Sequence, residues 1–272
     1  MRFLFLLAIA SSLAGCASMP PTQTLQLGAS RVAYARAGNG QPVAVFQSGL
    51  GDGMDVWAPV IHRVAPGTAV FAYDRVGYGA STVVPTAPRR DPCTIARELH
   101  DTLQAAGVPP PYVLVGHSIG GLYQYAFAKL YPDEVAAVLL VDPTHPDHWA
   151  RMQREAPASA RLINGMRATV FTATVRAEFD AQAGCADELA ARAPTHMPVR
   201  LLVRSSFGLA EPPAFEALVR RLEAEWPTLM PGTTRRQVEG AGHYIQKDSP
   251  DVVADELKAL IQALPARKPA QI

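Results

Sequence analysis

Short apolar runs that alternate with helix-like segments constrain the fold of this chain more than any other feature. Several runs are apolar at consecutive positions, as in PVAVFQ and VAAVLLVD, so both faces of such a strand are expected to be buried. Strands of this kind occur in parallel sheets that are covered by helices on both sides. Seven runs are predicted to be strands, at residues 31–35, 42–47, 69–74, 112–117, 135–142, 199–203 and 234–240.

The segments between these runs carry helical periodicity. Residues 94–107 place Ile95, Leu99 and Leu103 four residues apart, and residues 249–264 carry a second apolar stripe. With 272 residues, 49% of them hydrophobic, the chain is long enough to bury one substantial core. The sequence therefore predicts an α/β fold with a mostly parallel, doubly wound sheet.

One long stretch breaks the alternation. Residues 144–196 are rich in Ala, Arg and Met and contain no convincing strand. Loops of this length are uncommon unless they have a function. We therefore expect a helical cap at 144–196, inserted between two parts of the core at 25–143 and 197–265, with a polar tail at 266–272.

The side chains of this predicted cap leave its role open. Its arginines are more typical of a solvated face than of an anionic substrate site. Its large apolar residues either line an apolar substrate pocket or form the core of the cap itself: Trp149, Met152, Met166 and Phe171.

The N-terminus has the pattern of an export signal. MRFLFLLAIASSLAGC has one basic residue, an apolar stretch too short to span a bilayer, and then small residues. Its end, LAGC, resembles the lipobox of bacterial lipoproteins. The resemblance implies cleavage after residue 15 and lipidation of Cys16, with residues 16–24 as a tether and the protein held in the cell envelope. An ordinary signal peptide, in which Cys16 is incidental, is the alternative.

The charge of the chain excludes one class of partner. Formal net charge is +1, and removal of residues 1–15 takes away Arg2, leaving 24 basic against 24 acidic residues. A balanced chain without blocks of like charge has no electrostatic footprint for nucleic acid.

Two cysteines remain beyond Cys16. An even pair in an exported protein predicts a disulfide, here between Cys93 and Cys185. Such a bond would fasten the cap to the core. The alternative is that both are small buried hydrophobic residues.

A single serine lies among glycines where a predicted strand gives way to a predicted helix. In YVLVGHSIGGLYQYAF, Gly116, Gly120 and Gly121 surround Ser118, although a glycine inside an element costs roughly 0.5–1 kcal/mol relative to alanine. Either the glycines allow a helix to pack closely on a sheet, or they permit a sharp turn that presents the hydroxyl to a substrate. The match to G-x-S-x-G between a strand and a helix favours the second explanation.

A serine hydroxyl is a poor nucleophile until a base takes its proton. Of the seven histidines, His243 is the best candidate for this base, because it lies between the last predicted strand and the final predicted helix. Structural roles are expected for the histidines within or beside predicted elements: His62, His100 and His117. Three more belong to the cap or its edges and could line a pocket: His145, His148 and His196.

Four motifs, in order, resemble the α/β-hydrolase fold over nearly all of the mature chain. They are FQSGLGDGMDVW, DRVGYGAS, GHSIG and GAGH. The first has Ser48 where the family usually has histidine. The resemblance implies a Ser–acid–His triad with Ser118 as nucleophile and His243 as base, an oxyanion hole formed by the backbone amides of Leu50 and Ile119, and no metal or cofactor. The spacing in GLGDG also differs from the G-x-G-x-x-G of dinucleotide-binding loops.

The triad acid departs from the family's usual pattern. The family most often places an Asp shortly after the strand that here reads VRLLV, but RSSFGLAEPP follows, with Glu211 as its only acid. The preceding predicted strand ends in Asp142, a position that some members use. We expect Asp142 to be the acid, with Glu211 as the alternative and Asp147 as a more distant one. Asp142 could instead only cap the next turn, since Asp-Pro commonly opens turns.

Together these features predict an exported, lipid-anchored serine hydrolase that cleaves a small-molecule carboxylic ester, or a related acyl bond, through an acyl-enzyme. Carbon–carbon bond hydrolases and perhydrolases of this fold keep the serine and are alternatives, as is a non-catalytic binding module. Dehalogenases and epoxide hydrolases of this fold attack with an aspartate, which Ser118 disfavours.

Overall fold

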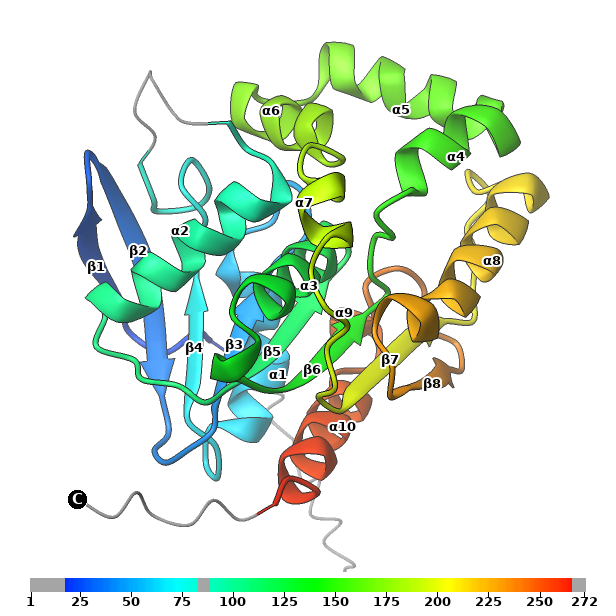
Figure 1. Ribbon diagram of the computed structural model, residues 1–272. Helices are drawn as coiled ribbons and strands as arrows, with labels where there is room; N and C mark the ends of the chain where they lie inside the picture. Colours follow the sequence, from blue (N-terminus) through cyan, green and yellow to red (C-terminus); the bar gives the residue numbers. More distant parts are fainter. Residues whose placement is uncertain (1–17, 83–88, 266–272) are drawn as a thin grey trace, which may run out of the picture.

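The computed structural model describes residues 18–82 and 89–265. One sheet of eight strands runs through the middle of this part, with helices on both of its faces (Figure 1). The predicted signal peptide at 1–15, Cys16 and the predicted tail at 266–272 lie outside the described residues.

The sheet has the order β1-β2-β4-β3-β5-β6-β7-β8. Its five pairings from β4 to β8 are parallel, whereas β2 is antiparallel to both β1 and β4. The predicted mostly parallel α/β fold is therefore confirmed. The strands are β1 (Thr22–Leu27), β2 (Ser30–Ala37), β3 (Val43–Gln47), β4 (Val70–Tyr73), β5 (Tyr112–His117), β6 (Val135–Val141), β7 (Val199–Arg204) and β8 (Thr233–Val238).

Side chains that alternate along the central strands build a separate core on each face. In β3, Val43 and Val45 join one apolar cluster, while Ala44 and Phe46 join the other. Helices α2 (Pro92–Ala105) and α3 (Ile119–Leu130) cover the first face, and α1 (Ala58–Val64) and α10 (Pro250–Gln262) cover the second. Burial on both faces explains why these strands are continuous apolar runs.

The predicted tether at 16–24 is wrong at its C-terminal end. Thr22–Leu27 forms β1, which pairs with β2 along its whole length. The sequence TQTLQL is mostly polar because this edge strand is largely exposed, and only Leu25 and Leu27 pack against the core. The low apolar content of this segment therefore does not predict a strand, although the alternation of its polar and apolar residues is compatible with one.

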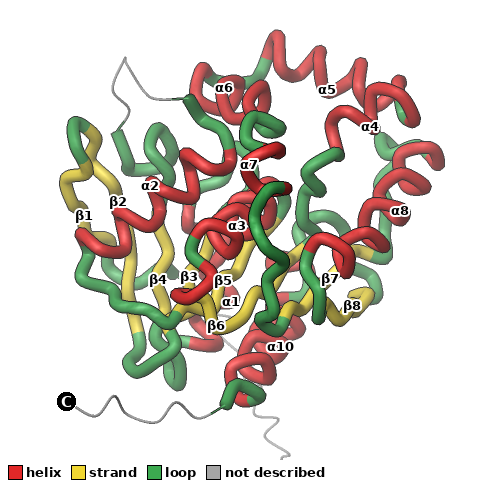
Figure 2. The backbone as a smooth tube through the Cα atoms, in the orientation of Figure 1, coloured by secondary structure: helices red, strands yellow, loops and turns green. Residues whose placement is uncertain are grey.

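Four helices fill the chain between β6 and β7, where the sequence predicts a helical cap. They are α4 (His148–Glu155), α5 (Pro157–Thr169), α6 (Ala173–Ala181) and α7 (Ala186–Ala190). Helix α8 (Pro213–Leu229) follows β7 and was not anticipated. Met152 of α4 and Ala160 of α5 share an apolar cluster with Leu218 and Leu222 of α8. In Figure 2, α5 lies at the top between α6 and α4, with α8 below α4 and α7 below α6.

The end of the insertion that contains α7 is fastened to the core. A disulfide joins Cys93, at the start of α2, to Cys185, which directly precedes α7. Arg97 of α2 and Glu188 of α7 form an ion pair beside it. The insertion therefore meets the core at α2 through a covalent bond and at α8 through apolar packing.

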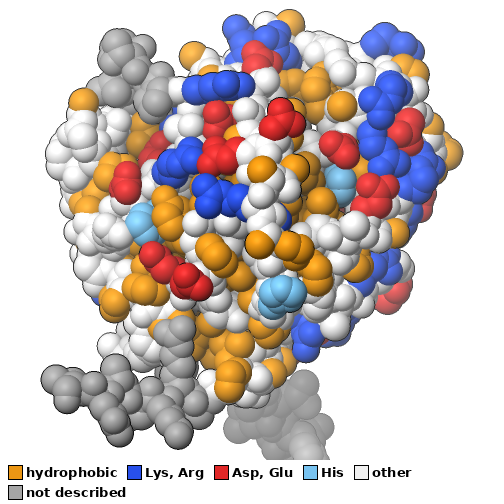
Figure 3. Space-filling view, in the orientation of Figure 1, with side chains coloured by type: hydrophobic (Ala, Val, Ile, Leu, Met, Phe, Trp, Pro, Cys, Tyr) orange, Lys and Arg blue, Asp and Glu red, His pale blue; other side chains and the backbone are white. Residues whose placement is uncertain are grey.

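The arginines of the insertion are all at least partly exposed, whereas its Glu178 is buried. Arginines gather along the upper and right-hand edges of Figure 3, over α4, α5 and α8. Arg151 pairs with Glu155 and Glu225, and Arg167 pairs with Asp180. These pairs are typical of a solvated face. Among the described helices, none combines the length and the hydropathy needed to cross a membrane.

Candidate active site

Ser118 lies on a sharp corner between β5 and α3. Its φ of 54° and ψ of −127° are strained values for a residue with a side chain. The flanking glycines make this corner possible, because a Cβ on Gly116 would lie 2.6 Å from the Gly120 carbonyl oxygen and one on Gly121 would lie 2.6 Å from Pro143 Cβ. The glycines thus serve both close packing and the turn that presents the hydroxyl.

Three predicted residues meet at the carboxyl ends of three different strands. Ser118 follows β5, Asp142 follows β6, and His243 lies beyond β8. His243 Nε2 is 3.1 Å from Ser118 Oγ, and its Nδ1 is 2.6 Å from Asp142 Oδ2. The imidazole thus lies between the hydroxyl and the carboxylate, and its side chain remains 35% exposed.

Asp142 is held as a buried carboxylate. It is 5% exposed, and its φ of 44° makes it, with Ser118, one of only two non-glycine residues with positive φ in the described ranges. Burial alone would raise the pKa of Asp142. The hydrogen bond from His243 and the charge of Arg204 outweigh burial and lower this pKa to about 2.

Arg204, at the end of β7, is a member of the site that the sequence did not reveal. Its Nε lies 2.7 Å from Asp142 Oδ2, and its Nη2 lies 2.8 Å from His243 Nδ1. Because both the guanidinium and the Nδ1–H are donors, the Asp142 oxygen is the acceptor that they share. The feature of the sequence that could have pointed to Arg204 is a charged residue at the end of a mostly apolar strand.

The alternative acid, Glu211, is separated from the imidazole by Arg204. One of its carboxylate oxygens pairs with Arg204 Nη1, and the other accepts the Gly208 amide at 2.7 Å. Glu211 therefore offsets the charge of Arg204, while Asp142 is the carboxylate that contacts Nδ1. Asp147, the third candidate, is placed at the start of α4.

His117 supports the loop that carries His243. Its Nε2 lies 2.9 Å from the His243 backbone carbonyl oxygen, which can only accept, so Nε2 carries the proton. Burial, followed by the nearby charge of His243, lowers the pKa of His117 to about 3, so this ring stays neutral. The structural role expected for His117 is therefore to hold the backbone of the loop that carries His243.

The two amides expected to form an oxyanion hole flank the point where the strand order reverses. The chain passes from β3 to β4 on one side and then to β5 on the other side, and open α/β sheets bind ligands at such points. Leu50 follows β3, and Ile119 begins α3. Within the described ranges, neither amide donates to another backbone group.

The apolar residues of the insertion mostly pack against protein. Met152 is buried against α8. Trp149 and Phe171 contact Phe179 edge to face, with ring centroids 4.7 and 5.5 Å apart. Met166 is 43% exposed. Of the two explanations for these side chains, the packing of Met152, Trp149 and Phe171 fits the core of the insertion better than a substrate pocket.

The described part of the chain holds one cluster of potential metal ligands, and this cluster does not include Ser118, Asp142 or His243. Across the described ranges, the one group of three acidic, histidine or cysteine side chains close enough to share an ion is Asp91, Cys93 and Cys185. Both cysteines of this group are in the disulfide, so neither offers a thiolate.

Sequence comparison identifies the family. A sequence model described as "Alpha/beta hydrolase family" matches residues 44–256, which include all of the residues that meet at Ser118. The chain belongs to the alpha/beta hydrolase family.

Individual relatives resemble different parts of this alpha/beta hydrolase. RutD of Escherichia coli K12, provisionally named a carbamate hydrolase, is 30% identical over 203 residues, which cover 74% of this chain and 69% of RutD. The uncharacterized protein YqjL of Bacillus subtilis is 30% identical over 112 residues, 41% of this chain. That match spans only 44% of YqjL.

Solved structures share the fold at low identity. A provisionally named alpha/beta hydrolase from Nostoc sp PCC 7120 is 16% identical with a TM-score of 0.72, covering 89% of this chain and 98% of its own. A protein from Pseudomonas aeruginosa, provisionally named an epoxide hydrolase, is 21% identical with a TM-score of 0.66, covering 89% and 95%. At these identities the likeness shows the fold alone.

Proposed function

We propose that this alpha/beta hydrolase is a serine hydrolase that cleaves a carboxylic ester, or a related acyl bond, of a small molecule. The observation that carries the proposal is the contact of one imidazole with both a hydroxyl and a carboxylate. His243 Nε2 lies 3.1 Å from Ser118 Oγ, while Nδ1 lies 2.6 Å from a carboxylate oxygen. This arrangement allows a base to take the serine proton.

In the proposed reaction, Ser118 Oγ attacks the acyl carbon as His243 Nε2 accepts its proton. Asp142 holds the Nδ1–H tautomer and stabilises the imidazolium. The amides of Leu50 and Ile119 bind the oxyanion of the tetrahedral intermediate. Its collapse breaks the bond to the leaving alcohol, which takes the proton from His243. Water then attacks the acyl-enzyme by the same route and releases the acid.

Arg204 adds a charge that this mechanism has to accommodate. A guanidinium beside Nδ1 opposes formation of the imidazolium, whereas Asp142 favours it. Glu211 pairs with Arg204 on the side away from His243 and offsets part of its charge. Arg204 in return anchors the Asp142 carboxylate against the imidazole.

The acyl class of substrate includes carbamates, which the name of RutD suggests for that relative. Carbamate and ester cleavage use the same attack of a serine on an acyl carbon. The hydroxyl of Ser118 at the corner after β5 separates this chain from family members that attack with an aspartate.

We further propose that the protein is exported and tethered to a membrane through lipidated Cys16. The LAGC sequence supports lipidation. The disulfide between Cys93 and Cys185 supports an oxidising compartment, because such bonds rarely persist in the cytosol. Expression in a bacterium fed an alkyne fatty acid tests this proposal. The parent should be labelled and Cys16→Ser should not; equal labelling of both variants would contradict it.

A series of p-nitrophenyl esters with graded acyl chains tests the activity. The parent should release p-nitrophenol, and Ser118→Ala should lower kcat by roughly 10⁴–10⁶. The control is Ser159→Ala, because Ser159 is a buried serine of α5 whose hydroxyl has no partner among the described residues. Equal turnover by the parent and Ser118→Ala would end the proposal.

A further inference from the structure

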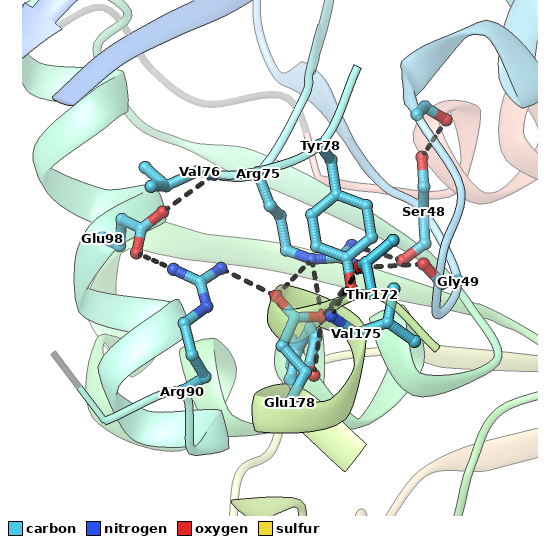
Figure 4. Close-up of polar contacts among 12 residues, drawn as sticks. Ser48, Gly49, Arg75, Val76, Tyr78, Arg90, Glu98, Thr172, Val175 and Glu178 are labelled. Carbon is cyan, nitrogen blue, oxygen red and sulfur yellow. Dashed lines mark hydrogen bonds and ion pairs between the residues drawn. The ribbon is translucent and has the colours of Figure 1, made fainter. Parts of the chain in front are cut away.

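A buried ion network connects the insertion to the loop after β3 (Figure 4). At its centre is Glu178 of α6, whose side chain is 0% exposed. Arg75, which follows β4, and Arg90, which precedes α2, both donate to this carboxylate. The residues that meet here are 103 and 88 positions apart in the chain, so the network joins three separate segments.

Arg75 also holds the backbone of the loop that contains Leu50. Its Nη1 donates to the Ser48 carbonyl oxygen and its Nη2 to the Gly49 carbonyl oxygen, each at 2.7 Å. The Gly49 carbonyl and the Leu50 N–H belong to one peptide unit, which is planar and trans, so they point in opposite directions. Arg75 therefore fixes the direction of the Leu50 N–H, the proposed oxyanion donor.

This peptide needs such a restraint because glycines flank Leu50. Gly49 precedes it, and Gly51 follows with a φ of 84°. Glycines allow backbone conformations that other residues avoid, so rotation of the intervening peptides meets little steric resistance. A rotated peptide would turn the Leu50 N–H away from its present direction.

Arg75 in turn depends on Glu178. The guanidinium side chain is only 1% exposed, and a buried cation without a partner is strongly destabilising. Two of its N–H groups serve the loop, while Nε and Nη2 face Glu178 at 3.1 to 3.3 Å. Burial would raise the pKa of Glu178, but the charges of Arg75 and Arg90 lower it. The carboxylate therefore stays ionised and keeps Arg75 in place.

The surroundings leave Arg75 little freedom to move. It stacks over the ring of Tyr78, 4.4 Å from the centroid, and the Tyr78 hydroxyl donates to Glu178 at 2.8 Å. The disulfide between Cys93 and Cys185 keeps the adjoining end of the insertion on α2. Glu178 is thus supplied by a segment that cannot easily leave the core.

We propose that Glu178 is a positioning residue for the oxyanion donor at Leu50 and acts through Arg75. The insertion thereby takes part in transition-state stabilisation, although Glu178 itself contacts no substrate. This inference rests on the proposed function, because an oxyanion forms only if Ser118 attacks an acyl group.

Glu178→Gln tests the inference, because it removes the charge with almost no change in shape. Loss of one whole oxyanion donor costs about 10²–10³ in kcat, so a misdirected donor is expected to cost about tenfold to a hundredfold. KM should change less than threefold. The Ki of a phenylboronic acid should rise by the same factor as kcat falls, because its serine adduct places an oxygen where the oxyanion forms.

Two measures separate this role from a purely structural one. Rates are expressed per active site, titrated with a fluorophosphonate, so that unfolded protein does not count. Glu188→Gln breaks the exposed pair between α7 and Arg97, and it should leave kcat and the boronate Ki unchanged. If Glu178→Gln does not fold, Glu178→Asp keeps the charge on a shorter side chain and should show a smaller fall in kcat with a matching rise in Ki.

The inference is overturned if a folded Glu178 variant keeps the kcat of the parent. It is also overturned if kcat falls while the boronate Ki stays the same. These outcomes differ from failure of the proposed function, in which Ser118→Ala would turn over esters as fast as the parent.

Discussion

Replacement of Asp142 by Asn distinguishes the two candidate acids of the triad. The substitution preserves shape but removes the charge that lies 2.6 Å from His243 Nδ1. Two effects follow from this loss. The imidazolium that forms in the transition state loses its counterion, and the side-chain amide can present its N–H₂ to Nδ1, which favours the wrong tautomer.

The structure sets the size of the first effect. Charge centres about 4 Å apart interact by about 4 kcal/mol at an effective dielectric constant of about 20. Since about 1.4 kcal/mol corresponds to a tenfold change in rate, loss of the carboxylate charge should lower kcat/KM by about 10³. Arg204, 2.8 Å from the same nitrogen, would then oppose the imidazolium without compensation. Asp142→Asn combined with Arg204→Gln should therefore be more active than Asp142→Asn alone.

The assay is kcat/KM for a p-nitrophenyl ester between pH 6 and 9, with Glu211→Gln as the matched control. Glu211 contacts Arg204 rather than the imidazole, so this variant should stay within about tenfold of the parent, because Asp142 keeps its contact with His243 Nδ1. An Asp142→Asn variant within tenfold of the parent, together with an inactive Glu211→Gln variant, would show that Glu211 is the acid.

Three further predictions concern the stability of the fold. Cys93→Ala combined with Cys185→Ala opens a bond across a separation of 92 residues, and urea unfolding should show a loss of about 4.6 kcal/mol from chain entropy; a loss below 1 kcal/mol would contradict this. Because folding holds the pKa of His117 at about 3, the unfolded chain binds the extra proton as pH falls below about 6.5. Stability should then fall by up to about 1.4 kcal/mol per pH unit down to about pH 3; the same acid dependence in folded His117→Asn would be the contrary result. A Cβ at Gly120 would lie 2.4 Å from the Gln47 carbonyl oxygen, so Gly120→Ala should cost about 1–3 kcal/mol by overpacking and should lower kcat; an unchanged Tm would argue against the close approach.

Much of the fold could be predicted because burial on both faces makes a strand apolar throughout. The runs in β3, β5 and β6 have this property, and their neighbours in the sheet follow from alternation with helices. Strand β1 could not be predicted in this way, because an edge strand exposed to solvent carries polar residues at most of its positions.

The site could be predicted only where a local turn demands particular residues. Gly116 and Gly120 flank Ser118 because the corner leaves no space for a Cβ at either position. The choice between Asp142 and Glu211 was harder, because it depends on which strand end reaches the imidazole after folding.

Sequence patterns did not indicate which buried charged residues pair with one another. Arg204 meets Asp142 across 62 positions, and Arg75 meets Glu178 across 103. No helical or strand periodicity relates such pairs, because each is created by the packing of distant elements. Arg75 could be noticed in DRVGYGAS as part of a motif, but its hold on the loop after β3 depends on the tertiary structure.

The central claim is that the Ser118 hydroxyl is activated by His243. The most direct measurement is the rate of fluorophosphonate labelling, followed by mass spectrometry of the modified peptide. The parent should carry one adduct, on Ser118. Protein that is heat-denatured before the probe is added should not be labelled, and neither should Ser118→Ala. In His243→Ala the adduct should form at least 10³-fold more slowly. An adduct on another residue, or equal labelling of the parent and His243→Ala, would contradict the account.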